Sequence, residues 1–174
     1  MADKNTFTTE EWATLRQVPH IVGMAIAGSG GGVVGAVKEA LSAARTMAEN
    51  AQNTSGVIRD ICNAEEAKAA EENLRKLVMD NVTSMTPDKL KQMAVDSATK
   101  ATTILKEKAG SEVEAYGDFV LNVADSVSKA AKEGGFLGFG GELVSAGETA
   151  VISSVSAALK GTSGISSMLG KIGS

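Results

Sequence analysis

Apolar residues recur every three or four positions through most of this chain of 174 residues. That spacing puts them on one face of an α-helix, whereas a half-buried strand alternates apolar and polar residues. No stretch of the chain suggests a sheet. The helical spacing is most regular in residues 113–130, at Val113, Tyr116, Val120, Val123, Val127 and Ala130. The pattern therefore predicts an all-α protein.

The first predicted helix begins with two reinforcing signals. Thr8 is an N-cap residue with Glu11 three positions later, which makes a capping box, and Phe7 and Trp12 can form a hydrophobic staple around it. Pro19 lies inside the helix and has no N–H to donate, so we expect a kink or a break just before it. The apolar stripe of this helix consists of Trp12, Leu15, Pro19, Val22 and Ile26.

Glycine dominates the next stretch, "GSGGGVVG" (28–35). We expect the first helix to end near Ala27 and a second to run from Val33 to about Asn53, folded back on the first. The predicted hinge between them consists of Gly28, Gly30, Gly31 and Gly32.

Residues 55–78 form one helix or two, and the apolar spacing does not decide between these alternatives. Thr86 as N-cap and Pro87 at the first helical position predict the next helix, with Gly110 just beyond its end. Two Ser-x-x-Glu capping boxes open the last two long helices, at Ser111–Glu114 and Ser145–Glu148.

These signals together predict an all-α helical bundle of about six helices with glycine-rich inter-helix loops. We expect one bundle domain over residues 1–161, followed by an amphipathic tail over residues 162–174. The tail has linker-like composition but carries a helical stripe of apolar residues at Ile165, Met168, Leu169 and Ile172.

Composition narrows the classes of function. Aromatic residues make up only 3% of the chain, so its core must be aliphatic and rich in Ala, which lets helices approach closely. The net charge is −4, and Lys and Arg alternate with Glu as in "EEAKAAEENLRK", so we expect no nucleic-acid partner. The single cysteine and the polar start "MADKNTFTTEEW" favour a cytoplasmic location.

The glycine-rich stretch also invites two other interpretations. Residues 30–35 match G-x-G-x-x-G, but a dinucleotide site needs parallel strands, and the chain offers only a short "GVI". Residues 18–37 carry no charge and place small residues four apart, as membrane helices do, yet the glycines divide the apolar run. A soluble helical hairpin fits better, while peripheral contact with a membrane stays open as an alternative.

Catalytic and metal chemistry lack the necessary residues. His20 is the only histidine and Cys62 the only cysteine, so neither a zinc site nor a catalytic triad can be assembled, and we expect no enzyme and no cofactor. We expect His20 to be a partly buried, hydrogen-bonded side chain and Cys62 a small core residue. The acidic pairs are typical of a solvated surface: Glu10/Glu11, Glu65/Glu66 and Glu71/Glu72.

The stretch "EGGFLGFGGELVSAGE" (133–148) carries bulky residues on a glycine scaffold. It forms either a turn that closes the end of the bundle or an apolar knob offered to another subunit or a ligand. The candidate interaction residues are therefore Phe136, Leu137 and Phe139, together with Ile165, Met168, Leu169 and Ile172 of the tail.

Two segments carry a family resemblance. The first is "EEWATLRQVPHIVGMAIA", followed by a glycine-containing break and "GAVKEAL", and the second is "AAKEGGFLGFGGELVSAGE". Both resemble an uncharacterised family of small bacterial all-helical proteins. The resemblance implies a helical fold with a loop at 28–32, and it implies no established activity.

From these observations we expect a non-enzymatic, self-associating helical protein, a structural or assembly-forming component whose partner is a second copy of itself. The alternative is a helical bundle that binds a hydrophobic ligand or a membrane surface.

Overall fold

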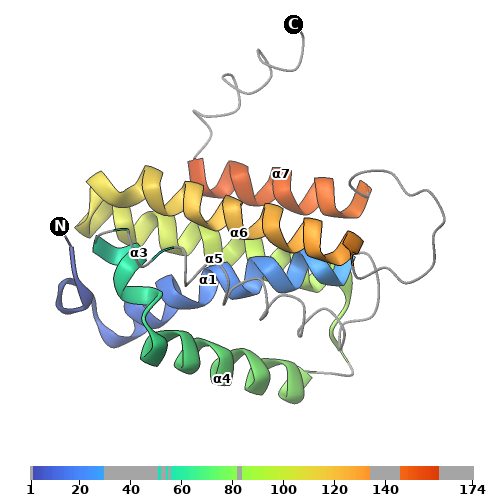
Figure 1. Ribbon diagram of the computed structural model, residues 1–174, viewed down its shortest axis with the longest axis horizontal. Helices are drawn as coiled ribbons and strands as arrows, with labels where there is room; N and C mark the ends of the chain where they lie inside the picture. The colour runs from blue at the N-terminus through green and yellow to red at the C-terminus, as the bar shows by residue number, and fades with distance from the viewer. Residues whose placement is uncertain are drawn as a thin grey trace, which may run out of the picture.

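The computed structural model describes residues 2–29, 51, 54, 56–81, 84–133 and 146–160 (Figure 1). These residues form helices and no strand, which confirms the all-α prediction. Short 3-10 turns, η1 (Lys4–Thr6) and η2 (Gly110–Glu112), precede α1 and α6. The helices are α1 (Thr9–Ser29), α3 (Gly56–Ile61), α4 (Ala64–Asn81), α5 (Pro87–Lys108), α6 (Val113–Glu133) and α7 (Ala146–Lys160).

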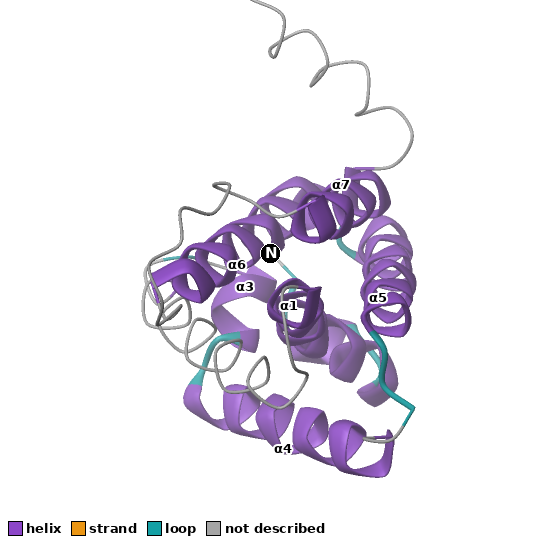
Figure 2. Ribbon diagram, turned by 90° about the vertical axis from the view of Figure 1, so that its right-hand side faces the viewer, coloured by secondary structure: helices purple, strands orange, loops and turns teal. Residues whose placement is uncertain are grey.

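Helix α1 lies at the centre of the bundle and contacts α4, α5, α6 and α7 (Figure 2). Helices α5, α6 and α7 surround one side of α1, and α4 lies on the opposite side. This position explains why α1 is buried at every position from Ile21 to Gly28. The largest fully buried side chains of the core are Tyr116, Leu15, Met24, Ile26, Leu90 and Leu105.

The predicted helix starts are confirmed for α1 and α5. The Thr8 N–H donates to Glu11 Oε2 at 2.7 Å, and the Glu11 N–H donates to Thr8 Oγ1 at 3.3 Å, so both halves of the capping box form. The rings of Phe7 and Trp12 lie 5.8 Å apart, as a hydrophobic staple requires. At α5, the Thr86 hydroxyl accepts the Lys89 N–H.

The expected break at Pro19 is wrong, since α1 continues as a helix through it to Ser29. A proline at this position leaves the carbonyl of Leu15, four residues earlier, without its intrahelical donor. The buried hydroxyl of Tyr116 on α6 donates to that carbonyl at 2.6 Å. A tertiary hydrogen bond therefore replaces the backbone bond that Pro19 cannot make.

The predicted end of α1 is displaced by two residues, because Gly28 is buried within the helix instead of belonging to a hinge. Small side chains are favoured there because α7 begins close by. A Cβ atom added to Gly147 would lie 3.3 Å from Ser29 at the end of α1. Gly30, Gly31, Gly32 and the second predicted helix, up to about Asn53, lie outside the described residues apart from Ala51.

Residues 55–78, left open by the sequence, contain two helices, α3 and α4, separated at Cys62 and Asn63. The predicted capping box at Ser111 is also wrong. Ser111 lies within the 3-10 turn η2, which runs directly into α6. Gly110 does follow the last residues of α5, as the first residue of that turn.

Candidate interaction surfaces

The solvent-facing side of α7 differs from that of the other long helices. Between Glu148, which is buried, and Lys160 at the end of the helix there is no charged residue. The exposed and half-exposed positions along one side, which we call the α7 outer face, are Thr149, Ala150, Ser153, Ser156 and Ala157.

Charges cover the corresponding sides of the neighbouring helices. The exposed residues of α6 include Glu114, Asp118, Asp125 and Lys129, and α5 exposes several lysines along its length. Charged side chains keep a helix surface hydrated, whereas small uncharged ones let another helix approach closely. The α7 outer face is therefore the helix surface, among those described, that is best suited to packing against a further helix.

Polar contacts fix α7 to the bundle at both ends. Near its start, the Ser128 hydroxyl of α6 lies 3.5 Å from Glu148 Oε2, and both residues are buried. At its end, Thr102 of α5 places its hydroxyl 3.3 Å from the Ala158 carbonyl oxygen and 3.5 Å from that of Leu159. That hydroxyl also lies 2.9 Å from the Ala98 carbonyl oxygen of its own helix. These contacts fix the helix that presents the outer face.

The interaction residues suggested by the sequence cannot be placed. They lie outside the described residues, and so does Ser145 of the third predicted capping box. The α7 outer face, which the described residues do include, connects the two regions in sequence. The residues concerned are Phe136, Leu137, Phe139, Ile165, Met168, Leu169 and Ile172.

A groove separates α4 from α1 along part of their length. It has a volume of about 330 Å³ and is lined by Gln17, His20 and Ile21 of α1 and by Asn73, Leu74 and Leu77 of α4. Its lining mixes amide, imidazole and aliphatic groups with the charged side chains of Lys76 and Asp80. A second hollow of about 270 Å³ lies between α1 and α5 and shares Gln17 and Ile21 with the groove.

An ionic cluster around a buried carboxylate joins α4 to η1 and α1. The Glu66 carboxylate, 4% exposed, lies 2.5 Å from Lys4 Nζ and 2.6 Å from an Arg16 guanidinium nitrogen. The indole of Trp12, itself 2% exposed, lies close to the same carboxylate, but its Nε1–H makes no well-aligned hydrogen bond. We call Lys4, Arg16 and Glu66 the Glu66 cluster.

Burial of the carboxylate tends to raise the pKa of Glu66, but the donors Lys4, Arg16 and Trp12 more than offset this and hold the pKa below its usual range. The expectation that Glu66 belongs to a solvated pair is therefore wrong, whereas Glu65 is exposed. The sequence did carry a signal, because Glu66 shares a helix face with Ala70 and Leu74, four and eight residues later.

His20 is a partly buried, hydrogen-bonded side chain as predicted, whereas Cys62, predicted to be a core residue, lies at the edge of the core. His20 is half-buried, its Nδ1 lies 3.3 Å from the Arg16 carbonyl oxygen, and burial lowers its pKa. Cys62 is half-buried against the core, and burial raises the pKa of its thiol to about 12. A thiol with so high a pKa is a poor nucleophile at neutral pH.

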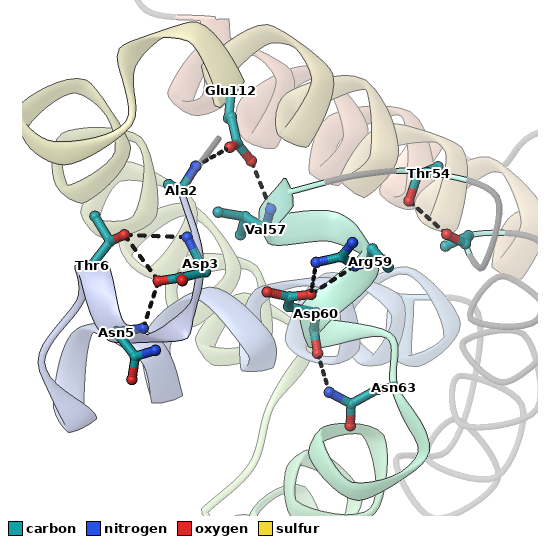
Figure 3. A network of polar contacts seen from close by, with 11 residues as sticks. Ala2, Asp3, Asn5, Thr6, Thr54, Val57, Arg59, Asp60, Asn63 and Glu112 are labelled. Atoms are coloured by element: carbon teal, nitrogen blue, oxygen red, sulfur yellow. Dashed lines mark hydrogen bonds and ion pairs between the residues drawn. The ribbon is translucent and has the colours of Figure 1, made fainter.

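A second polar junction holds the amino-terminal segment and α3 together (Figure 3). The Glu112 carboxylate accepts the Ala2 N–H at 2.8 Å and the Val57 N–H at 2.7 Å. Gly56 has a φ of +65°, and a Cβ atom there would lie 2.4 Å from a Glu112 oxygen. Position 56 therefore favours glycine for two reasons: its φ is positive, and a Cβ atom would collide with the Glu112 carboxylate. The role of this junction is structural, because the backbone N–H groups of Ala2 and Val57 each bind one oxygen of the Glu112 carboxylate.

Within the described part of the chain, no group of three or more His, Cys, Asp or Glu residues is arranged to hold a metal ion. None of the described helices is long and apolar enough to cross a membrane. No protein-family model, curated protein or solved structure matches the chain. The resemblance to a family of small helical proteins stays a prediction, and the candidate surfaces have to be interpreted from their own chemistry.

Proposed function

We propose that this protein is a non-enzymatic, self-associating helical protein in which the α7 outer face packs against a second copy of the chain. The observation that carries this proposal is the absence of charge along that face, between the buried Glu148 and Lys160. A second copy presents the same small uncharged residues, so that two helices can approach closely without burying an unpaired charge.

The tail belongs to the same proposal. Residues 162–174 follow α7 closely in sequence and carry the apolar stripe Ile165, Met168, Leu169 and Ile172. In the proposed assembly this stripe docks on a neighbouring copy as an amphipathic helix in a groove. The tail would then add apolar contact area to an interface whose α7 part consists of small side chains.

Charge substitutions test the role of the α7 outer face. Replacing both Ala150 and Ser153 with Lys should convert the assembly to monomers, because each interface would then contain four unpaired ammonium groups. The matched control replaces Ala115 and Asn122, which are exposed on α6, with Lys. Particle mass is measured by size-exclusion chromatography with light scattering.

A monomeric wild-type protein would overturn the proposal, and so would an α7 variant with the same mass as the α6 control. Deleting residues 162–174 separates the two contributions. The proposal expects a smaller assembly after the deletion, and an unchanged mass would remove the tail from it. Circular dichroism of each variant verifies that the helices remain folded.

A second candidate function is binding of a hydrophobic ligand or a membrane surface, supported by the groove beside α4 with Ile21, Leu74 and Leu77 in its lining. Its volume lies near the lower limit of small-molecule sites, roughly 300–1,000 Å³. Native mass spectrometry of the purified protein tests for a retained lipid, and flotation with anionic liposomes tests for surface binding. A ligand-free protein that does not float would rule this candidate out.

A further inference from the structure

Helix α4 is attached to the bundle by unusually few buried residues. Of its 18 residues only Glu66, Ala70 and Leu74 are buried, and one of these is a carboxylate. Farther along the helix, Leu77 and Val78 are only partly buried against the core, and the groove lies beside Leu77 with Gln17 and His20 of α1 in its lining. The described contacts of α4 are with α1 and, to a smaller extent, with α3. The fully buried contacts of α4 therefore all lie in its first three turns.

The Glu66 cluster is an ionic contact in those first turns. Lys4 comes from η1, Arg16 from α1 and Glu66 from α4, so one carboxylate joins α4 to two elements near the start of the chain, whose cations lie 62 and 50 positions away in sequence. The exposures of the three side chains differ, at 59% for Lys4, 18% for Arg16 and 4% for Glu66. If the cluster separates, Lys4 can be hydrated with little rearrangement, whereas Glu66 becomes hydrated only if α4 moves away, and Arg16, whose Nε is buried without a hydrogen-bond partner, would lose its carboxylate partner.

We propose that the Glu66 carboxylate holds α4, which we call the strap, against α1. Neutralising this carboxylate releases α4 from α1, while α1, α5, α6 and α7 stay packed against one another. Residues 62–63 and 82–86 connect α4 to α3 and α5, so the strap remains tethered at both ends when it opens. Opening widens the existing groove and uncovers the α1 surface that contains Ile21.

Helices α1, α5, α6 and α7 share a core to which Glu66 does not contribute. The main core lies among α1, α5, α6 and α7, where Leu15, Leu90, Leu105 and Tyr116 are fully buried. Loss of α4 contacts would leave that core in place, since α4 adds only Ala70 and Leu74 as buried apolar residues. Separate opening of a weakly attached element is common in native proteins.

The direction of the pH dependence follows from the cluster. The charged groups that face Glu66 are Lys4 of η1 and Arg16 of α1, and both favour its ionised form. Because the pKa of Glu66 is lowered in the folded state, its stabilising effect is complete above the usual value of 4.5 and is lost as the pH falls through the folded-state pKa. His20 lines the same interface, with Glu71, Lys76 and Asp80 of α4 as the charged groups around it. Burial lowers the pKa of His20 by more than Glu71 and the Arg16 carbonyl raise it, so protonation of His20 also favours opening.

The test compares Glu66→Gln with Glu65→Gln by hydrogen exchange of the full chain at pH 7. Both substitutions remove one carboxylate from the first turn of α4, but only Glu66 is buried. The proposal expects Glu66→Gln to accelerate exchange of the α4 amides by about ten- to a hundredfold, with the amides of α5 and α6 unchanged. Glu65→Gln should leave both sets within about twofold of the wild type.

Trp12 gives an independent readout, because it is the only tryptophan of the chain and lies beside Glu66. Opening of α4 should shift its emission to longer wavelength and increase quenching by acrylamide in Glu66→Gln, with no change in Glu65→Gln. Unchanged α4 exchange and unchanged Trp12 emission in Glu66→Gln would overturn the proposal. Equal acceleration in α4, α5 and α6 would overturn it as well, since Glu66 would then hold the whole fold.

The wild-type protein supplies a test that does not depend on a variant folding. On acidification below pH 4.5, Trp12 emission should change at a higher pH than the far-ultraviolet circular dichroism of the bundle. In Glu66→Gln, in which α4 is already released at pH 7, this early transition should be absent. Coincident transitions in the wild type would contradict a separate opening of α4.

Discussion

Helices α1 and α4 are of similar length and pack against each other, yet they are held in place in opposite ways. In α1, twelve of 21 residues are buried, all of them uncharged, and other helices surround it. In α4 three of 18 residues are buried, and one of these is the ionised Glu66. The two helices show that one bundle can combine an element held by extensive apolar burial with an element that buries few residues, one of them an ion-paired carboxylate.

The difference determines which helix can move. Apolar burial is not directional and can be lost only by exposing the area concerned, so α1 cannot leave without unfolding the core. A buried ion pair is lost when either of its two groups is neutralised, and replacing both partners by apolar residues often changes stability little. Helix α4 therefore has a condition under which it can detach, and α1 has none short of global unfolding.

The largest expected effect comes from the same substitution made in each helix. Leu15→Ala in α1 should lower the free energy of unfolding by about 3–5 kcal/mol, because Leu15 is fully buried between packed helices. Leu74→Ala in α4 should lower it by no more than about 2 kcal/mol, because α4 can adjust beside the groove. Urea denaturation measures both values. If the two variants lose the same free energy of unfolding, α4 is packed as tightly as α1 and the proposed difference between them is wrong.

An intermediate effect is expected at the contact that keeps α1 continuous. Tyr116→Phe leaves the buried Leu15 carbonyl without a donor and should lower the free energy of unfolding by about 1–3 kcal/mol. In a Pro19→Ala background the new N–H of residue 19 can donate to that carbonyl, so Tyr116→Phe should be less harmful there. The double-mutant cycle isolates this coupling from the effect of Pro19 on the unfolded chain.

If Tyr116→Phe lowers stability equally in both backgrounds, the Tyr116 hydroxyl does not substitute for the backbone donor that Pro19 lacks. Circular dichroism of Pro19→Ala alone serves as the control, since that variant should keep α1 fully helical.

The smallest expected effect is on the rate at which the Cys62 thiol is labelled and not on the stability of the protein. Cys62 lies between α3 and α4, and with a pKa of about 12 only about one thiol in ten thousand is ionised at pH 8. Iodoacetamide should therefore label the folded protein far more slowly than the urea-unfolded chain. Glu66→Gln should accelerate labelling and Glu65→Gln should not. Labelling of the folded protein at the rate of the unfolded chain would mean that the α3–α4 junction is not packed.

Local signals in the sequence predicted the local features of the fold. The capping box at Thr8 and Glu11, the staple of Phe7 with Trp12 and the start of α5 at Thr86 all involve residues at most five positions apart. The helical spacing of apolar residues was enough to predict an all-α bundle, because each helix buries one face whatever its partner is.

The errors arose where distant residues decide the structure. The helix through Pro19 depends on Tyr116, and the burial of Glu66 depends on Lys4 and Arg16, which no local pattern connects to it. The residues singled out in the sequence as interaction candidates lie outside the described part of the chain, while the α7 outer face became visible only once its buried side was known. Position on a helix can be predicted locally, whereas a partner across the bundle cannot.

The hydrogen bond from Tyr116 to Leu15 also bears on the order of folding. It joins residues 101 positions apart, so the backbone of α1 is completed only after the chain has closed a long loop and docked α6. During synthesis α1 leaves the ribosome long before α6 does, and until then its centre has an unsatisfied carbonyl beside a proline. An amino-terminal fragment that ends before α6 should therefore have an incompletely formed first helix, and the packing of α1 against α6 should form late.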